Sequence, residues 1–447
     1  MTGDPRIRRL NDISICDGRY VLYWMQQSQR VHYNHALLRA SYWSLNLDLP
    51  LIVYFGLMND YPEANLRHFT FMMEGLSHVS EDLEQLGIKL VVKRCHPVQG
   101  ADELSKEASI IICDMGYLKH QRKWRKELSS RSRCPVEMVE TDVVVPVEEA
   151  YPKEAYSAAV LRPKIRKHLK DNLVVPRELW PEKDSMNLDI ESLDMTRPEK
   201  ILKEMDLDSS VPPVEEFRGG GGEANIRLQR FIDGKLEKYS SERNDPTKGI
   251  QSDLSPYLHF GQISPLFIAM KVINEGGNGT DEFLEELIIR RELSMNYAYY
   301  NTDYESFEGL PNWAVTTLED HTSDPRDVVY PLEVLENAET HDPYWNAAQN
   351  EMAKTGKMHN YMRMYWGKKI LEWTEDPREA FDKAIYLNNK YNLDGRDPNS
   401  YTGVAWCFGK HDRPWTERPV FGKVRYMNNR GLERKFDMDP YLKKFGG

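Results

Sequence analysis

Residues 20–25 read Tyr20-Val-Leu-Tyr-Trp-Met25, and residues 50–55 read Pro50-Leu-Ile-Val-Tyr-Phe55. Both runs are short, apolar and rich in β-branched and aromatic residues, which is typical of a strand that is buried on both faces. Three similar runs follow at residues 88–93, 109–113 and 135–147, the last of which contains Val143-Val-Val145. Helical patterns separate these runs. We therefore predict a Rossmann-like α/β domain over residues 1–150, with a parallel sheet covered by helices on both faces.

The helices of this domain carry end signals. Asn34 precedes a helical pattern that runs to about residue 45, and an asparagine there can cap the first turn. Residues 66–86 form a second helical pattern, and Gly87 follows where a helix C-cap is expected. A polar helix is predicted over about residues 120–130.

The pattern changes after Pro146. Residues 162–170 form a basic helix, and an acidic stretch with several prolines then runs to Gly219-Gly-Gly-Gly222, so we predict a long connector over residues 151–222. Beyond it, strand patterns largely vanish and helical periodicity dominates. We predict an all-helical domain over residues 223–447, with helices at 224–239, 263–274, 281–300, 345–355, 361–374 and 377–391.

Size and charge limit the classes of function. The 447 residues predict two or three domains, and the net charge of −11 argues against indiscriminate binding of polyanions. The charge is uneven, however. Residues 181–216 hold 11 acidic and 4 basic side chains (net −7), whereas residues 405–435 hold 8 basic and 3 acidic (net +5). An acidic protein with one basic C-terminal surface can still dock nucleic acid locally.

The compartment follows from what the sequence lacks. Its longest apolar run, residues 49–58, is about half of what crosses a bilayer, and the first residues lead into no signal-type apolar block. The five cysteines form no Cys-x-x-Cys pair, which favours free thiols in a reducing compartment over disulfides or structural zinc. We expect a cytoplasmic protein that uses no metal ion and has no membrane partner.

Common catalytic motifs are absent or out of context. Gly219-x-Gly221-x-x-Ala224 formally matches a dinucleotide-binding fingerprint, but no strand precedes it and no βαβ unit follows, so a flexible loop is favoured. The sequence holds no P-loop, no Gly-x-Ser-x-Gly elbow and no His-Glu-x-x-His helix. Hydrolase and nucleotide triphosphatase functions therefore lose most of their support.

Two other patterns leave alternatives open. Trp366 and Trp373 are seven residues apart on one predicted helix, so they share a face, either as part of the core or as an electron relay. Glu286 lies four residues before Arg290 and next to the apolar run Leu287-Ile-Ile289. It therefore either forms a surface ion pair with Arg290 or is a buried carboxylate of the kind found at functional sites. Residues 251–261, which include Ser252 and Ser255, can hold a phosphate or cap a helix.

Taken together, these segments resemble the photolyase/cryptochrome family. The resemblance extends over most of the chain, and the sequence is most similar to the class II cyclobutane pyrimidine dimer photolyases. It is carried by Ser252-Asp-Leu-Ser-Pro-Tyr-Leu-His-Phe-Gly261, Glu286-Leu-Ile, Met358-His-Asn-Tyr-Met-Arg-Met-Tyr-Trp366 and Asp394-Gly-Arg-Asp-Pro-Asn-Ser-Tyr-Thr-Gly-Val-Ala-Trp406.

The resemblance implies FAD inside the helical domain. Ser252, Leu254 and Ser255 would contact its phosphates with Tyr239 nearby, and Arg363 paired with Asp394 would lie against the flavin, with Asn388 at its reactive edge. The acid Glu286 would hydrogen-bond the carbonyl of a flipped-out pyrimidine dimer. Trp406 would stack on that dimer, and Met364 would line its pocket.

The sequence departs from the family pattern at two positions. Ile289 stands where members outside class II usually carry a tryptophan, and Val404 stands where many relatives have the innermost relay tryptophan. As in class II enzymes, Trp366, Trp373 and Trp345 would form the relay instead. The resemblance also makes the basic C-terminal segment a rim that contacts DNA phosphates, through Lys410, Arg413, Arg418, Lys423, Arg425 and Arg430.

The expected function is light-driven repair of cyclobutane pyrimidine dimers by an electron from reduced FADH⁻. The alternatives are a cryptochrome-type photoreceptor, a (6-4) photolyase, or a nucleotide-binding protein without photochemistry. The partner would be UV-damaged DNA and the protein a monomer. Whether a deazaflavin, a folate or no antenna chromophore binds the N-terminal domain stays open.

Overall fold

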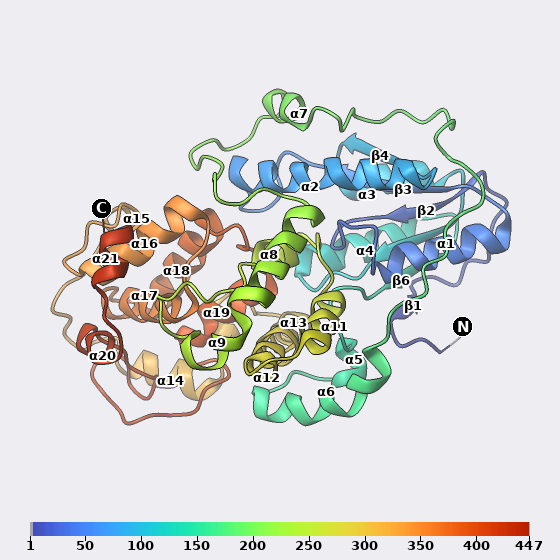
Figure 1. Cartoon of the computed structure of the whole chain (residues 1–447). Helices are drawn as coiled ribbons and strands as arrows, with labels where there is room; N and C mark the ends of the chain where they lie inside the picture. The colour runs from blue at the N-terminus through green and yellow to red at the C-terminus, as the bar shows by residue number, and fades with distance from the viewer. Residues whose placement is uncertain (1–2, 447) are drawn as a thin grey trace.

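The computed structural model describes residues 3–446 and begins with a six-stranded sheet (Figure 1). The strand order is β1-β6-β5-β2-β3-β4, and all neighbouring strands are parallel except β1, which pairs antiparallel with β6. The predicted parallel sheet is thus confirmed, with one short edge strand that the sequence pattern missed. The strands are β1 (Ile7–Arg9), β2 (Tyr20–Trp24), β3 (Leu51–Leu57), β4 (Lys89–Arg94), β5 (Ala108–Asp114) and β6 (Val136–Val139).

Helices cover both faces of this sheet. On the first face, α1 (His35–Leu47) and α2 (Leu66–Gln85) pack against Val21 and Tyr23 of β2. On the second, α3 (Pro97–Ser105) and α4 (Lys119–Arg131) pack against the alternate residues Leu22 and Trp24. This alternation follows from the two-residue period of a strand.

Asn34 caps α1 as its sequence predicted. Its side-chain oxygen accepts hydrogen bonds from the backbone N–H groups of Ala36 and Leu37, at 3.1 and 3.0 Å. The amide nitrogen donates to the backbone oxygens of Ser28 and Arg30. The cap therefore also fixes the loop that leaves β2.

Val143-Val-Val145 form no strand, which corrects our prediction of a strand that continued to residue 147. The three side chains are fully buried, but the segment is a loop after β6. Its backbone N–H groups at Val144 and Val145 donate to the carboxylate of Glu292 instead of to a neighbouring strand. A fully apolar run reads the same in a buried loop as in a strand, because burial and not pairing sets its composition.

Helix α5 (Val147–Ala150) lies just before the predicted connector. The connector itself contains α6 (Ala158–Asn172) and α7 (Pro198–Glu204). In Figure 1, α6 lies on the lower side of the molecule and α7 on the upper side. The remaining segments of this part of the chain are extended or irregular.

From residue 221 onward the chain is helical, as predicted. The predicted helix at 281–300 consists of α12, a π-helical turn η1 and α13. The elements are α8 (Gly221–Gly234), α9 (Leu236–Glu242), α10 (Ser255–His259), α11 (Pro265–Glu275), α12 (Thr280–Leu284), η1 (Glu285–Arg290), α13 (Arg291–Tyr300), η2 (Phe307–Gly309), α14 (Asn312–Asp320), α15 (Leu332–Glu336), α16 (Pro343–Thr355), α17 (Asn360–Glu372), α18 (Pro377–Tyr391), α19 (Pro398–Cys407), α20 (Asn429–Glu433) and α21 (Asp439–Phe445).

Buried arginines join the helical part to the sheet. Arg30 donates to the backbone oxygen of Gly261 at 2.9 Å, and Arg291 donates to that of Asp142. Such buried, hydrogen-bonded contacts fix the two parts relative to each other. Among residues 3–446, no helix is long and apolar enough to cross a membrane.

Candidate functional site

A cavity of about 250 Å³ opens between α9, α10, η1, α17 and the start of α19. Its wall brings together segments that lie more than 150 residues apart in the sequence. Six of the residues predicted to bind FAD line this cavity, together with the predicted acid Glu286. They are Tyr239, Ser252, Leu254, Ser255, Arg363 and Asp394.

Arg363 and Asp394 meet at the wall of this cavity. The Arg363 Nη2 atom lies 3.5 Å from Asp394 Oδ1, and it also donates to Asn392 Oδ1 at 3.5 Å. Arg363 Nε and Asp394 Oδ1 are buried, yet neither has a hydrogen-bond partner among the described residues. Buried polar atoms without partners are costly, so this wall fits a ligand with both donor and acceptor groups, as the ring edge of a flavin has.

The loop before α10 is electropositive and tightly held. Asp253 adopts a left-handed backbone conformation with φ of 59°, and Lys357 and Lys235 hold its carboxylate. Burial alone would raise the pKa of Asp253, but the two lysines hold it below its usual value. The adjacent hydroxyls of Ser252 and Ser255, with Lys357, line the cavity and fit a phosphate.

Asn388 does not line this cavity, unlike the other predicted cofactor-binding residues. It is 1% exposed; its side chain donates to Asn389 Oδ1 at 3.1 Å and accepts from Asn392 Nδ2 at 2.8 Å. Because Asn392 also accepts from Arg363, Asn388 belongs to the same hydrogen-bonded group. It lies one layer behind the cavity wall.

Glu286 enters the cavity from η1, the π-helical turn. Its Oε1 atom accepts a hydrogen bond from Arg243 Nη1 at 2.6 Å, and its side chain is 30% exposed. Burial and the charge of Glu286 raise the pKa of the neighbouring Tyr239 to about 12. π-Helical turns are frequent at functional sites because they re-aim side chains locally.

Trp406 and Met364 lie outside the lining of this cavity. Trp406 is partly exposed, and the Arg290 guanidinium lies over its ring at 5.3 Å from the centroid. Met364 is partly buried, with its sulfur 3.8 Å from that of Cys407. Ile289 is 5% exposed and packs in the helical core, so it forms no wall of an open pocket.

The three tryptophans proposed as a relay are buried and in contact. Trp345 lies between the other two: its ring stacks on Trp366 at 6.3 Å and packs edge-on against Trp373 at 5.6 Å. The Trp345 indole N–H donates to the Trp366 backbone oxygen, and the Trp366 indole N–H donates to Gln349. All three side chains also belong to the helical core.

The predicted DNA-contacting residues divide into two groups. Lys410 is 5% exposed, and its ammonium binds Glu154 and the backbone oxygen of Gly309, which differs from the surface cation we expected. The others are exposed: Arg413, Arg418, Lys423, Arg425 and Arg430. The Lys410 ammonium also lies over the ring of Tyr297, 4.2 Å from its centroid.

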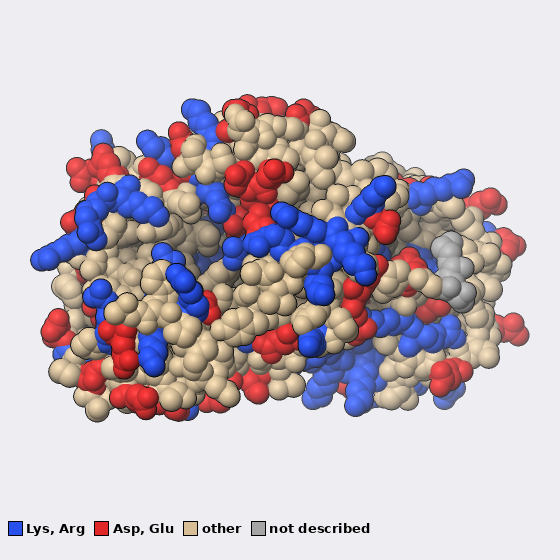
Figure 2. All heavy atoms as spheres, turned by 90° about the horizontal axis from the view of Figure 1, so that it is seen from below, with Lys and Arg blue, Asp and Glu red and all other residues tan. Residues whose placement is uncertain are grey.

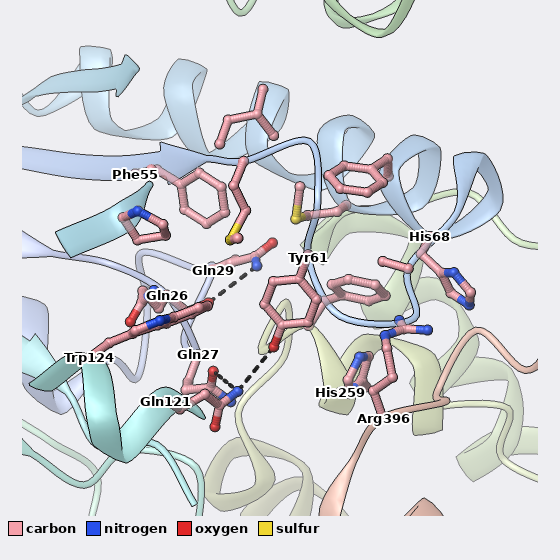
Figure 3. A pocket seen from close by; sticks show the side chains of 18 residues that line it. Gln26, Gln27, Gln29, Phe55, Tyr61, His68, Gln121, Trp124, His259 and Arg396 are labelled. Atoms are coloured by element: carbon pink, nitrogen blue, oxygen red, sulfur yellow. Dashed lines mark hydrogen bonds between the residues drawn. The ribbon is translucent and has the colours of Figure 1, made fainter. Parts of the chain in front are cut away.

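A second cavity, of about 80 Å³, lies at the carboxyl end of the sheet and was not predicted (Figure 3). Gln26 and Gln27, which follow β2 after Met25, line this cavity with Tyr61 and Trp124. Gln121 donates to Gln27 at 2.8 Å and to the Tyr61 hydroxyl at 3.3 Å, as the dashed lines show. Ligands of open α/β sheets bind at this end, so polar residues directly after an apolar strand were the available signal.

The two cavities share a wall. His259 lines both, and its Nδ1 atom lies 3.0 Å from Asp397 Oδ2. Arg396 faces the cavity at the sheet, whereas the next residue, Asp397, faces the first cavity. Burial would raise the pKa of Asp397, but its hydrogen bond with His259 and nearby charges lower it to about 2.

This combination of an α/β sheet domain and a helical domain with an internal polar cavity defines the photolyase and cryptochrome fold. A solved archaeal photolyase from Sulfolobus tokodaii, described with two FAD molecules, superposes with a TM-score of 0.72 at 16% identity, over 95% of this chain and 89% of that one. The model of the DNA photolyase family matches residues 21–183.

Two curated relatives cover nearly the whole chain. The deoxyribodipyrimidine photo-lyase of Methanothermobacter thermautotrophicus is 51% identical over 99% of this chain and 98% of its own length. That of Arabidopsis thaliana is 40% identical over 94% of this chain and 88% of its own. The chain therefore belongs to the DNA photolyase family.

Proposed function

We propose that this protein repairs cyclobutane pyrimidine dimers in DNA under near-UV or blue light, with reduced FADH⁻ as the active cofactor. The observation that carries the proposal is the cavity wall beside Glu286, where the buried Arg363 Nε and Asp394 Oδ1 have no hydrogen-bond partner among the described residues. The curated relatives are named for the same reaction.

When bound, FAD supplies a light-absorbing one-electron donor, and the electron returns to it after the cyclobutane ring has opened. Arg363 and Asp394 would orient the flavin ring, and Asn388 would support them through Asn392. Ser252, Leu254 and Ser255 would hold the phosphates near Lys357, with Tyr239 at the wall. These residues bind and orient the cofactor and do no covalent chemistry.

As a carboxylic acid, Glu286 would donate a hydrogen bond to a pyrimidine carbonyl of the dimer and so stabilise the negative charge that develops there. Its hydrogen bond with Arg243 fixes the carboxyl group, so that it can meet a pyrimidine carbonyl without reorganising. Trp406 and Met364 would contact the flipped-out dimer. The basic residues after Trp406 that are exposed would contact phosphates around it.

Trp366, Trp345 and Trp373 would restore the reduced state of the cofactor. Their contacts form one continuous aromatic path of the kind that carries single electrons by hopping, and it leads from Trp366 through Trp345 to Trp373. This role is separate from repair itself, which returns its electron in each turnover. A variant without the path should therefore still repair once it has been reduced chemically.

We also propose that the cavity at the sheet holds an antenna chromophore. Its lining combines aromatic faces with amide groups, which suits a planar heterocycle, and the Sulfolobus tokodaii structure contains two FAD molecules. A deazaflavin and a folate both have that chemistry. The absorption spectrum of the purified protein distinguishes them.

The free cysteines support a reducing cellular compartment. All five are unpaired in the structure, and Cys113, Cys134 and Cys407 are buried. We propose that the protein works in the cytoplasm. Correct folding in strictly reducing buffer, with unchanged FAD content, is the expected result.

The test of the proposed function is repair of a thymine-dimer oligonucleotide by the reduced protein in light and in darkness. Recovery of thymine absorbance only in light is the expected result. No recovery with FAD bound and fully reduced would overturn dimer repair. The same assay with a (6-4) lesion then separates a (6-4) photolyase from a photoreceptor.

A further inference from the structure

Helix α6 presents a strongly basic surface that the proposed function leaves unused. Its 15 residues contain five cations and one acid, Asp171. The cations Lys164, Arg166, Lys167 and Lys170 are all exposed. Among residues 3–446, no carboxylate lies within 4.0 Å of any of these four, so their charges are uncompensated by ion pairs.

Three of the cations share one face of α6. Arg162, Arg166 and Lys170 are spaced by four residues, which places them in one row along the helix. A helix of 15 residues is about 22 Å long, a length comparable to about six base pairs of duplex DNA. Lys167 lies at the border of the same face.

The row begins beside the proposed lesion site. Arg162 binds Glu285 through two hydrogen bonds, at 2.9 and 2.6 Å. Glu285 precedes Glu286, which lines the first cavity, and its Oε1 atom also lies 3.3 Å from Arg290 Nε. Because Arg290 lies over Trp406, one chain of contacts connects α6 with the aromatic residue proposed to meet the dimer.

A second connection fixes the same end of α6. The Tyr156 hydroxyl donates to the backbone oxygen of Asp412, and His411 Nδ1 lies 2.8 Å from the backbone oxygen of Tyr156. The start of α6 is therefore held against the segment that follows Trp406. Hydrogen bonds at the start of α6 thus fix the position of the basic row relative to the proposed lesion site.

The charge of the molecule is divided between opposite sides. The acidic stretch at 181–216 includes α7, which lies on the upper side in Figure 1, whereas α6 lies on the lower side. Figure 2 looks at the molecule from below and shows Lys and Arg side chains gathered across the middle of that face. A polyanion is therefore attracted to this side although the whole protein carries a net charge of −11.

We propose that α6 is a DNA-binding arm that contacts the phosphates of the duplex on one flank of the lesion. Arg166, Lys167 and Lys170 bind the backbone without reading its sequence, while Arg162 remains paired with Glu285 and holds the arm in place. The proposal rests on the proposed function for the position of the lesion. The arm itself requires only that the chain binds duplex DNA.

The test measures binding of the FAD-loaded protein to a fluorescent duplex with a central thymine dimer and about 15 base pairs on each side, over a range of salt concentrations. The variant carries Arg166→Gln, Lys167→Gln and Lys170→Gln. Its matched control carries Arg197→Gln, Lys200→Gln and Lys203→Gln at α7, which removes the same charge from exposed residues on the acidic side. FAD absorbance and the thermal midpoint check that both variants fold.

Each lost phosphate contact lowers the slope of log affinity against log salt by about 0.9, so the α6 variant should lose about 2 to 3 from the slope and roughly tenfold in affinity. The α7 variant should bind as the unchanged protein does. Equal salt slopes for the α6 variant and the unchanged protein would overturn the proposal that α6 contacts DNA.

Shortened duplexes test its placement. If one flank is cut to about 4 base pairs, the unchanged protein should lose the contribution of the arm for one flank and keep it for the other. Equal effects of both truncations would contradict contact on a single flank. A smaller salt slope in the α6 variant, together with no repair by the unchanged protein, would support the DNA-binding arm and overturn the proposed function.

Discussion

The indole rings of Trp345 and Trp366 lie nearly parallel, with an interplanar angle of 7° and centroids 6.3 Å apart. They come from different helices, α16 and α17, and the Trp345 indole N–H donates to the backbone oxygen of Trp366. Trp373 contacts Trp345, whereas the rings of Trp366 and Trp373 do not contact each other. The middle position therefore belongs to Trp345.

Trp345→Phe and Trp366→Phe should each block photoreduction of the oxidised cofactor. Phenylalanine fills most of the buried space but is far harder to oxidise than an indole. Light-driven repair by chemically reduced enzyme should persist in both variants. Photoreduction followed by flavin absorbance is the measurement, and Trp415→Phe, an exposed tryptophan outside the cluster, is the control. Normal photoreduction by Trp345→Phe would contradict the order of the path.

Glu286→Gln should lower light-driven repair without abolishing it. The amide still donates a hydrogen bond, but its N–H is a weaker donor than the O–H of a carboxylic acid. We expect a loss of about 1.4 kcal/mol, or roughly tenfold in rate. Repair rates at saturating light are the measurement. Glu285→Gln changes the neighbouring carboxyl group, which does not line the cavity, and should affect repair less. Equal losses in both variants would point to a general defect of η1.

Glu292 should make the protein less stable as pH rises. Burial raises the pKa of its carboxyl group to about 8, although the N–H groups of Val144 and Val145 oppose this. The unfolded chain has the ordinary, lower pKa and therefore binds fewer protons between about pH 4.5 and 8, so the free energy of unfolding falls with pH across that window. Glu292→Gln keeps an acceptor for both N–H groups. Thermal midpoints at several pH values should show a flatter profile for this variant, and an unchanged profile would contradict the assignment.

Gln121→Leu should reduce the content of a second chromophore while FAD content stays constant. The substitution removes the donor to Gln27 and Tyr61 but keeps a side chain of similar volume. The ratio of the two chromophores in the absorption spectrum is the measurement. Leu128→Met, a change of similar size in the core of α4 away from that cavity, is the control. Parallel loss of both chromophores would show that the variant disturbs folding instead.

Much of this fold was predictable because its elements carry strong periodicity. The parallel strands are predicted from their apolar runs, and the longer helices from their caps and amphipathic spacing, whereas α3 and several short helices after residue 300 were not predicted. β1 was missed because its three residues, Ile7–Arg9, are mostly charged and pair only at an edge. The apolar run at Val143–Val145 predicts a strand, because nothing in the local sequence reveals that its N–H groups donate to Glu292, far along the chain.

The candidate site was predictable only through motifs. The spacing of Trp366 and Trp373 placed them on one helix face but gave no information about Trp345, which enters from another helix. Lys410 was expected at the surface because its neighbours are charged, and its pairing with Glu154 depends on tertiary structure. The cavity at the sheet is built from separate loops, with only the glutamines after β2 as a local signal.

His259 links the two cavities through a single side chain held by Asp397. A substitution of His259 that suits a different chromophore in the cavity at the sheet must also remain compatible with the cofactor that we propose for the cavity among the helices. His259 is thus constrained by both cavities. A mutation of His259 that changes the ligand preference of one cavity also changes the wall of the other. Engineering of a new chromophore should leave His259 in place and vary the strand-end glutamines, which face one cavity alone.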